Sequence, residues 1–209
     1  MSCGTAAGRE GPRRGGPLHP RGTPRFPPRP SGRGPGPSFS VNAEFVLRAQ
    51  RAGKRALLLS GPIGSGKTSA VLSLSAELLG MGVALDGVAS PRILKNGKTV
   101  GYWVRRLPSG EERLLCALEP PGLPLGRFFF RPEALEFANT VLVRAAKEAE
   151  VVAIDEVGPL ELAGGGFFPG LQACLSSNAF LILTVRPHLV PSVQGWFGAK
   201  ALEIRLPAR

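Results

Sequence analysis

The chain is poor in the residues that build disulfide frameworks and histidine-based sites. Its 209 residues include three cysteines, at positions 3, 116 and 174, and two histidines, at positions 19 and 188. An odd number of widely spaced cysteines fits neither a disulfide framework nor a metal site, and two distant histidines exclude multi-histidine metal sites and histidine-based triads. We therefore expect free thiols in a reducing cytoplasm, and a chemistry that depends on other side chains.

Long hydrophobic runs are missing as well. The longest runs, such as residues 179–185, are far shorter than the roughly 20 apolar residues that a membrane-spanning helix needs. No charged segment followed by an apolar one opens the chain, so we expect no secretory signal, a cytoplasmic location and no membrane partner. The hydrophobic fraction of 43% is nevertheless typical of a globular protein with an ordinary core.

Acidic residues are almost absent from the first 40 positions. Residues 1–40 contain seven arginines and one acid, Glu10, a balance of +6 out of the chain's +11, so the other 169 residues carry only +5. This segment is rich in Gly, Pro, Arg and Ser, which predicts a disordered tail at 1–40 before a folded domain at 41–209. Basic stretches such as residues 13–16 could contact RNA or DNA phosphates. GC-rich coding bias is the stronger explanation of the arginines, so we expect no specific nucleic-acid function.

A glycine-rich loop is the most informative segment of the chain. Residues 61–68 fill every position of the pattern G-x-x-x-x-G-K-[ST], between the apolar run 56–59 and a helix-like run. Glycines let the backbone turn tightly and present N–H groups to phosphate, and the following helix N-terminus attracts negative charge. Lys67 is predicted to reach the β- and γ-phosphates and Thr68 to hold Mg²⁺, whereas the alternative is a glycine-rich turn before an unrelated helix. The nucleotide-binding residues predicted in this way are Gly61, Pro62, Ile63, Gly64, Ser65, Gly66, Lys67 and Thr68.

Alternating strands and helices are predicted from the hydrophobic periodicity. Strands are expected at 55–60, 83–89, 128–130, 150–155, 179–185 and 201–206, and helices at 67–79, 132–149, 167–177 and 188–197. Two-residue alternation and turn signals at 96–97 and 108–110 predict an antiparallel β-insert at about 92–118. The fold class is therefore α/β: a P-loop NTPase three-layer sandwich with a mostly parallel sheet and an antiparallel β-insert. Tyr102, Trp103 and Phe128–Phe130 are expected to serve packing rather than binding.

Two adjacent acids end the apolar strand near 151–156. Ligands of α/β sheets bind at the carboxyl ends of the strands, so Asp155 is predicted to hold Mg²⁺ opposite Thr68. Glu156 is predicted to accept a proton from, or to orient, the water that attacks the γ-phosphate, although two carboxylates that merely cap a strand are the alternative. Arg186 follows the apolar run 179–185 and could stabilise γ-phosphate charge as an arginine finger. A surface arginine that begins a loop explains it equally well.

The acidic segment also carries a resemblance to a known family. Residues 155–162, Asp-Glu-Val-Gly-Pro-Leu-Glu-Leu, resemble the D-E-[IV]-G-x-[LM]-E-L signature of the thermostable nucleoside-triphosphatase family of P-loop NTPases. The segment 87–90 and the hairpin residues 101–111 resemble further landmarks of that family, and the resemblance spans about 55–186. Pro159 stands where many members have Lys, which removes a charge near the site.

Slow Mg²⁺-dependent hydrolysis of ATP, GTP and other nucleoside triphosphates, with little base preference, is what this resemblance implies. It assigns Gly61–Thr68 to the nucleotide, Asp155 and Glu156 to metal and water, and Glu161 to support of the active-site loop. Two alternatives stay open: a P-loop kinase that phosphorylates a small acceptor, and a nucleotide-responsive binding module. The sequence contains no base-specificity motif and leaves the oligomeric state open.

Overall fold

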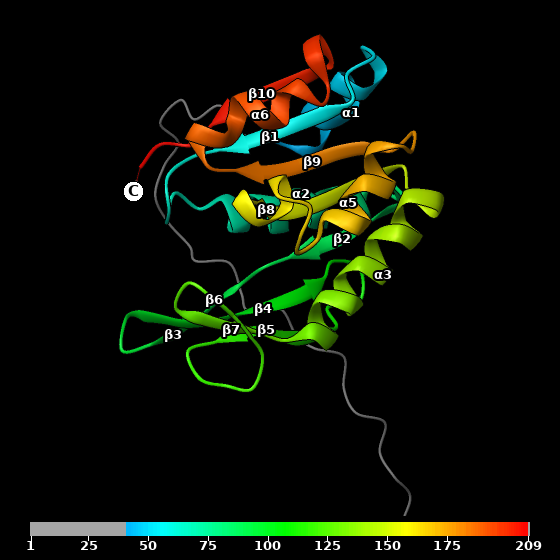
Figure 1. The fold of residues 1–209 in the computed structure, drawn as a ribbon. Coiled ribbons are helices and arrows are strands. Elements are labelled where there is room, and N and C mark those ends of the chain that lie inside the picture. The colour runs from blue at the N-terminus through cyan, green and yellow to red at the C-terminus, as the bar shows by residue number, and fades with distance from the viewer. Residues whose placement is uncertain (1–40, 209) are drawn as a thin grey trace, which may run out of the picture. The chain divides into compact units, whose positions relative to one another are not determined.

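A single mixed β-sheet with helices on both faces organises the described part of the chain. The computed structural model describes residues 41–208, and the predicted tail at 1–40 lies outside them. Figure 1 shows the helices α3 (Pro132–Glu148) and α5 (Phe168–Leu175) in front of the sheet, with α1 (Ala43–Arg51) and α2 (Lys67–Gly80) on the opposite face. The predicted three-layer α/β class is confirmed.

Two kinds of strand pairing divide this sheet. The strands are β1 (Ala56–Ser60), β2 (Leu85–Ala89), β3 (Arg92–Lys95), β4 (Lys98–Arg106), β5 (Glu112–Ala117), β6 (Leu123–Leu125), β7 (Phe128–Phe130), β8 (Val151–Val157), β9 (Phe180–Val185) and β10 (Ala201–Arg205). Their order is β10-β1-β9-β8-β2-β4-β5-β7-β6, with β3 on β4. Within residues 41–208 the first five strands in this order are parallel, and the others pair antiparallel. The antiparallel strands begin at Arg92 as predicted, but they continue to Phe130, beyond the predicted end at 118.

Alternate residues of the central strands build two separate cores. In β1, Ala56 and Leu58 face α3 and α5, whereas Leu57 and Leu59 face α1 and α2. All four side chains are fully buried, because helices cover both faces of a parallel sheet. This double burial explains the continuous apolar run that precedes the glycine loop.

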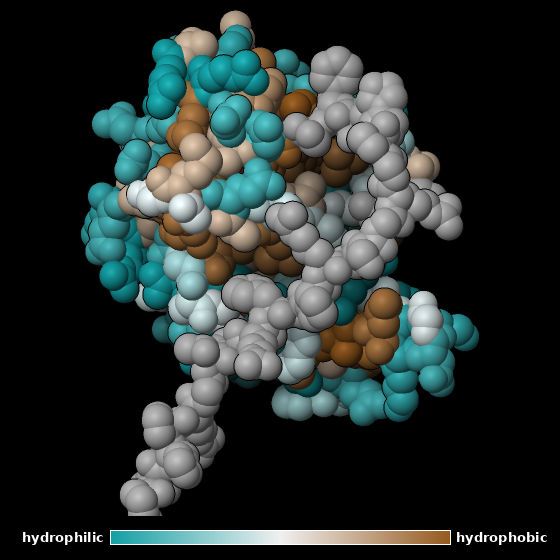
Figure 2. Space-filling view, turned by 180° about the vertical axis from the view of Figure 1, so that it is seen from behind, coloured by the Kyte–Doolittle hydropathy of each residue, from teal (hydrophilic) through white to brown (hydrophobic). Residues whose placement is uncertain are grey.

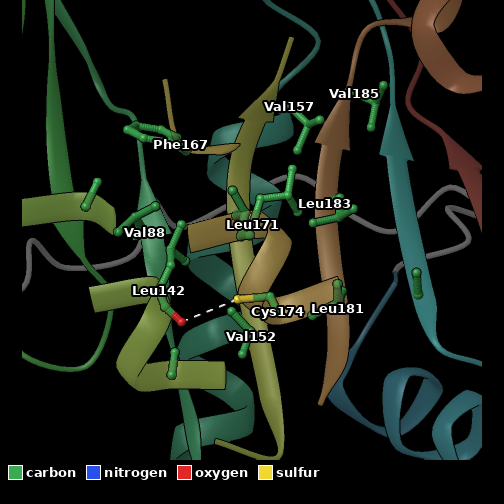
Figure 3. Packing of buried hydrophobic residues seen from close by; sticks show 14 of the residues in the cluster. Val88, Leu142, Val152, Val157, Phe167, Leu171, Cys174, Leu181, Leu183 and Val185 are labelled. Carbon is green, nitrogen blue, oxygen red and sulfur yellow. Dashed lines mark hydrogen bonds between the residues drawn. The ribbon is translucent and has the colours of Figure 1, made fainter. Parts of the chain in front are cut away.

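The core beneath α3 and α5 also contains one of the cysteines. Figure 3 shows Cys174 packed near Leu142 and Leu171, with its thiol donating to the Leu142 carbonyl at 3.4 Å. Burial raises the pKa of the Cys174 thiol to about 12, so it stays protonated at neutral pH. The thiol acts as a core side chain rather than as a nucleophile.

Several short helices depart from the predicted boundaries. The predicted helix at 188–197 is a 3₁₀ turn, η1 (Pro187–Leu189), followed by α6 (Val190–Gly195), since two prolines at 187 and 191 fix where each piece begins. The helix α1 was not predicted, although Asn42 caps it by accepting a hydrogen bond from the Phe45 N–H at 2.9 Å. Two further short pieces are α4 (Pro159–Leu162) and the 3₁₀ turn η2 (Gly198–Lys200).

Apolar side chains lie on the projecting antiparallel strands. Figure 2 shows brown surface on this part of the molecule, at the lower right, and Leu94, Leu118, Leu123 and Leu125 are exposed there. No helix within residues 41–208 combines the length and apolar character that crossing a membrane requires.

Candidate functional site

The glycine loop follows β1 and leads into α2, as its pattern predicts. Gly64 and Gly66 have φ angles of 84° and 91°, which residues with a Cβ rarely adopt. A Cβ on Gly61 would lie 2.5 Å from Ser65 Oγ and 3.0 Å from the Leu206 carbonyl oxygen, so only glycine fits there. The loop therefore places its backbone against the N-terminus of α2, where N–H groups and the helix dipole favour a phosphate.

Lys67 lies at the first position of α2 and its side chain folds over the loop. Its ammonium donates to the carbonyl oxygens of Gly61 at 2.7 Å and Pro62 at 2.9 Å. Partial burial lowers the pKa of Lys67, while the nearby carboxylates of Glu156 and Asp155 oppose that shift. The ammonium thus stands between the loop and the acids at the end of β8.

Asp155 is almost completely buried beside the loop. Its Oδ1 accepts from the Thr184 hydroxyl at 2.7 Å, and its Oδ2 accepts from the Ser90 N–H at 3.1 Å. Burial raises the pKa of Asp155, and hydrogen bonds from Thr184, Ser90 and the Thr68 hydroxyl oppose that rise. Thr184 of β9, Thr68 of α2 and Ser90, which follows β2, therefore fix the Asp155 carboxylate next to Thr68. Asp155 and Thr68 are the pair of oxygen donors that the sequence predicts for Mg²⁺.

Glu156 interrupts the regular strand β8. Its φ is 71°, a left-handed value that is uncommon for a residue with a side chain, and the pairing of β8 with β9 shifts between Ile154 and Val157. The Glu156 N–H donates to the side-chain Oγ1 of Thr184 on the neighbouring strand β9, at 2.6 Å. Such strained backbone is concentrated at functional sites, and here it turns a carboxylate out of the sheet edge.

Arg186 follows β9 and pairs with Glu156. Its Nη2 donates to Glu156 Oε1 at 2.8 Å, and about two fifths of each side chain is exposed. The Arg186 Nε is buried, and within residues 41–208 no group accepts a hydrogen bond from it. The structure thus places Arg186 beside the acids, and its function as an arginine finger stays a prediction.

The loop after β8 is held by a buried carboxylate. Glu161 accepts from the Gly158 N–H at 2.9 Å and from the Phe167 N–H at 3.2 Å, so one side chain joins both ends of the loop. Burial raises the pKa of Glu161, and the two N–H donors oppose that rise. Asn139 of α3 binds the same loop through Nδ2, which donates to the Gly166 carbonyl at 2.9 Å.

A partly open cavity of about 660 Å³ lies beside the pair of Glu156 and Arg186. The antiparallel strands, the loop after β8 and α3 line most of it. Its lining residues are Ser90, Tyr102, Leu115, Cys116, Leu125, Gly126, Phe128, Phe130, Leu135, Glu156, Gly158, Pro159, Leu160, Glu161, Ala163, Phe167 and Arg186. Phe128 and Phe130, predicted as packing residues, are partly buried and also form part of this wall.

The available ligands suit a magnesium ion better than a transition metal. No group of three or more His, Cys, Asp or Glu side chains gathers anywhere in residues 41–208. Magnesium needs only one or two protein oxygens, because it keeps waters and takes the rest of its ligands from substrate phosphates. Asp155 and Thr68 supply a carboxylate and a hydroxyl of this kind.

Comparison with known families agrees with this arrangement. A family model described as NTPase matches residues 56–197, which include the glycine loop, the acids of β8 and Arg186. The chain belongs to this NTPase family. The resemblance to thermostable nucleoside-triphosphatases read from residues 155–162 is thereby confirmed.

Both archaeal sequences and solved structures resemble this NTPase. The nucleoside-triphosphatase THEP1 of Thermofilum pendens is 34% identical over 130 residues, 61% of this chain and 71% of the relative. The THEP1 of Methanothermobacter thermautotrophicus is 32% identical over 139 residues, 66% of this chain and 80% of the relative. The solution structure of a human cancer-related nucleoside triphosphatase aligns with a TM-score of 0.56 at 25% identity, over 72% of this chain and 88% of that one. The crystal structure of Aquifex aeolicus THEP1 has a TM-score of 0.58 at 20% identity, covering 73% and 90%, and shares the fold.

Sequence reasoning missed three polar residues of this NTPase site. Thr184 binds both acids, Ser90 binds Asp155, and Asn139 binds the loop after β8. A signal existed for Thr184, which is the one polar residue in the apolar run 179–185. Ser90 and Asn139 had no such signal, because serine at a strand end and asparagine in a helix have many other uses.

Proposed function

We propose that the protein hydrolyses nucleoside 5′-triphosphates to nucleoside diphosphate and phosphate, with Mg²⁺ as its cofactor. The observation that carries this proposal is the position of Glu156, whose carboxylate meets Arg186 at 2.8 Å while Thr184 fixes its backbone. Membership of the NTPase family and relatives named nucleoside-triphosphatase support it. Nucleoside triphosphates are thus the proposed partners.

The nucleotide is bound by the loop and by Lys67. Backbone N–H groups of Gly61–Thr68 surround the β- and γ-phosphates, and the Lys67 ammonium reaches them as a positive charge. Burial lowers the pKa of Lys67, and the nearby carboxylates of Glu156 and Asp155 oppose that fall by favouring the charged form. Electrostatic stabilisation of this kind supplies most of the rate enhancement in phosphoryl transfer.

Thr68 and Asp155 would hold the magnesium ion. Held there, a magnesium ion would supply positive charge that neutralises charge developing on the phosphates. The hydrogen bonds from Ser90 and Thr184 orient the Asp155 carboxylate for this task.

Glu156 acts on the attacking water. Its partly exposed carboxylate accepts the proton that the water loses as its oxygen bonds to the γ-phosphorus. Arg186 lies beside it and stabilises charge on the γ-phosphoryl group. Water attack breaks the β–γ phosphoanhydride bond, and nucleoside diphosphate and phosphate leave.

Slow turnover, little base preference and a cytoplasmic location complete the proposal. The first two follow from the family resemblance. The location is supported by Cys116 and Cys174, which are free and buried, as is usual in a reducing compartment.

Phosphate release from Mg-ATP, Mg-GTP, Mg-CTP and Mg-UTP tests the proposal. Lys67→Ala is expected to lose nucleotide binding and turnover together. Glu156→Gln is expected to lose turnover while calorimetry still detects binding of Mg-ATP, since the amide keeps the shape but accepts no proton. Undiminished turnover in both variants would contradict the proposal.

A further inference from the structure

We propose that the 660 Å³ cavity beside Glu156 and Arg186 binds a small neutral alcohol with an apolar body, and that the protein transfers the γ-phosphoryl group to it. This inference rests on the proposed binding of nucleoside triphosphate. It adds a second substrate site and a kinase activity to the hydrolysis.

The walls of the cavity favour an apolar molecule. Tyr102, Phe128 and Phe130 line it from the antiparallel strands, and the Tyr102 and Phe128 rings meet edge to face at 5.6 Å. Leu160 and Phe167 line it as well, on the loop that Glu161 holds. Pockets of 300 to 1,000 Å³ with aromatic and aliphatic walls are typical sites for small organic ligands.

One end of the cavity is polar and belongs to the catalytic pair. Glu156 and Arg186 line this end together with Ser90. Ser90 is only 5% exposed, and its hydroxyl has no hydrogen-bond partner in the part of the chain that the structure describes. The Glu156 carboxylate, in contrast, is about two fifths exposed and can accept a hydrogen bond from a ligand hydroxyl at this end.

The position of the cavity separates the two substrates. No residue of the loop 61–68 lines it, although Glu156 and Arg186 belong to both the site and the cavity. The phosphates bound by the loop and an alcohol in the cavity would therefore occupy separate sites that both adjoin Glu156 and Arg186. Direct transfer requires two such adjoining sites, because the acceptor oxygen and the leaving oxygen lie on opposite sides of the phosphorus.

The charges of the lining select a neutral acceptor. Its charged residues are Arg186, Glu156 and Glu161, of which Arg186 is paired with Glu156 and Glu161 binds backbone N–H groups. No further cation lines the cavity to bind a second phosphate, so a nucleoside monophosphate would lack a partner for its charge. An alcohol brings no charge into this apolar space.

The transfer step uses the same base as hydrolysis. The alcohol O–H gives its proton to the Glu156 carboxylate while its oxygen forms a bond to the γ-phosphorus. The bond between the γ-phosphorus and the β,γ-bridging oxygen breaks, and nucleoside diphosphate leaves with that electron pair. The products are a phosphate monoester and nucleoside diphosphate, and the step consumes no other reactant.

Binding is tested with benzyl alcohol and 2-phenylethanol as probes and glycerol as the polar control. Saturation-transfer NMR of the full chain is expected to detect contact with both aromatic alcohols and none with glycerol at equal concentration. Absence of contact for the aromatic alcohols, or equal contact for glycerol, would overturn the site.

Transfer is tested with Mg-ATP and the same alcohols, with ³¹P NMR following phosphate and phosphate ester together. We expect benzyl or phenethyl phosphate beside phosphate, and no glycerol phosphate. If phosphate is released but no phosphate ester forms while the aromatic alcohol is bound, the proposed transfer is overturned. Absence of phosphate release without any alcohol would instead contradict the proposed hydrolysis, so the two failures are distinguishable.

A matched pair of variants on β6 locates the acceptor. Leu125 lines the cavity and Leu123 does not, and they are 45% and 57% exposed, so neither substitution empties the core. Leu125→Asp is expected to lower the ratio of ester to phosphate by about 10-fold or more, because a carboxylate in the wall disfavours an apolar ligand. Leu123→Asp is expected to leave that ratio unchanged, and an equal fall in both variants would overturn the assignment.

Discussion

Arg186 donates from Nη2 to Oε1 of Glu156 at 2.8 Å, although Glu156 lies in β8 and Arg186 follows β9. The pairing follows from the topology, because β8 and β9 are parallel neighbours and their carboxyl ends meet at one edge. Both side chains remain about two fifths exposed and border the cavity, so they can contact a substrate as well as each other. This pair joins the proposed nucleotide site to the cavity.

Removal of the guanidinium is expected to slow turnover strongly. Arg186→Ala should lower kcat by about 10³-fold, the lower end of what an arginine finger contributes, because charge on the γ-phosphoryl group loses its partner. Arg186→Lys should recover only part of this, since an ammonium lacks the planar donor pair. Steady-state phosphate release gives kcat for the parent chain, Arg186→Ala and Arg186→Lys.

Arg144→Ala is the control for this series. Arg144 is an exposed residue of α3 that pairs with Glu148 one helical turn away, and such pairs contribute little to stability. Its kcat is expected to match the parent chain. A similar loss in Arg144→Ala and Arg186→Ala would show that net charge, rather than position, determines the rate.

Loss of the Thr184 hydroxyl is expected to affect both acids at once. Thr184→Val keeps the shape of the side chain but removes the donor to Asp155 and the acceptor of the Glu156 N–H. We expect kcat to fall by about 10- to 100-fold, as for other groups that orient a metal ligand. The free energy of unfolding should fall by about 1–3 kcal/mol, because buried polar groups are left unpaired.

Thr184→Ser separates the hydroxyl from the methyl group. Because serine restores the donor and the acceptor, it should recover most of the turnover that Thr184→Val loses. Denaturant unfolding and phosphate release are measured on the same preparations. If serine and valine variants are equally slow, packing of the methyl group and not the hydroxyl orients the acids.

The buried carboxyl of Glu161 makes stability depend on pH. Its pKa lies above its ordinary value of 4.5, mainly because burial disfavours the charged form. The folded protein therefore holds this proton more tightly than the unfolded chain, so folding is favoured at low pH. The contribution of Glu161 to the free energy of unfolding is full below pH 4.5 and is lost as pH rises through the folded pKa.

Glu161→Gln isolates this effect. Glutamine does not titrate, so the difference in unfolding free energy between parent and variant is expected to change with pH above 4.5 and to be constant below it. The amide also loses one of the bonds to Gly158 and Phe167, which costs about 1–3 kcal/mol. Urea unfolding at a series of pH values measures both quantities. A difference that is independent of pH throughout would show that the Glu161 pKa is the same in the folded and unfolded chain.

The order of the main elements could be predicted because each depends on local pattern. The apolar run 56–59 and the loop 61–68 are adjacent in the sequence. A strand of a parallel sheet is buried on both faces, so it gives the same continuous apolar run in any protein of this class. Helix α3 was predictable for a similar reason, since its apolar residues recur at three and four positions. The last antiparallel strands were predictable only in part, because three-residue strands such as β6 carry too little periodicity.

The geometry of the site depends on long-range contacts that no local pattern contains. The left-handed backbone of Glu156 exists because Thr184, on the next strand, accepts its N–H. The pairing of Glu156 with Arg186 likewise requires β8 beside β9. The cavity could not be predicted at all, since its walls come from segments that meet only in the folded chain.

The left-handed backbone at Glu156 leads to the last prediction. Both Glu156→Gly and Glu156→Ala remove the carboxylate and its pairing with Arg186, so they differ only in the Cβ. At a φ of 71° a Cβ is unfavourable by about 1 kcal/mol or more, and glycine avoids this strain. We therefore expect Glu156→Gly to be more stable than Glu156→Ala by about 1 kcal/mol in urea unfolding.

In a strand with ordinary φ angles alanine is more stable than glycine, and such a position provides the control. Arg205, an exposed residue of the edge strand β10, has no positive φ, so Arg205→Gly should be less stable than Arg205→Ala by about 0.5–1 kcal/mol. Glycine and alanine variants that differ in stability with opposite signs at positions 156 and 205 would show that the effect comes from the Glu156 backbone. A general difference between glycine and alanine would give the same sign at both positions. If alanine were the more stable residue at both positions, the turn of β8 would be relaxed, and Thr184 alone would set the direction of the Glu156 carboxylate.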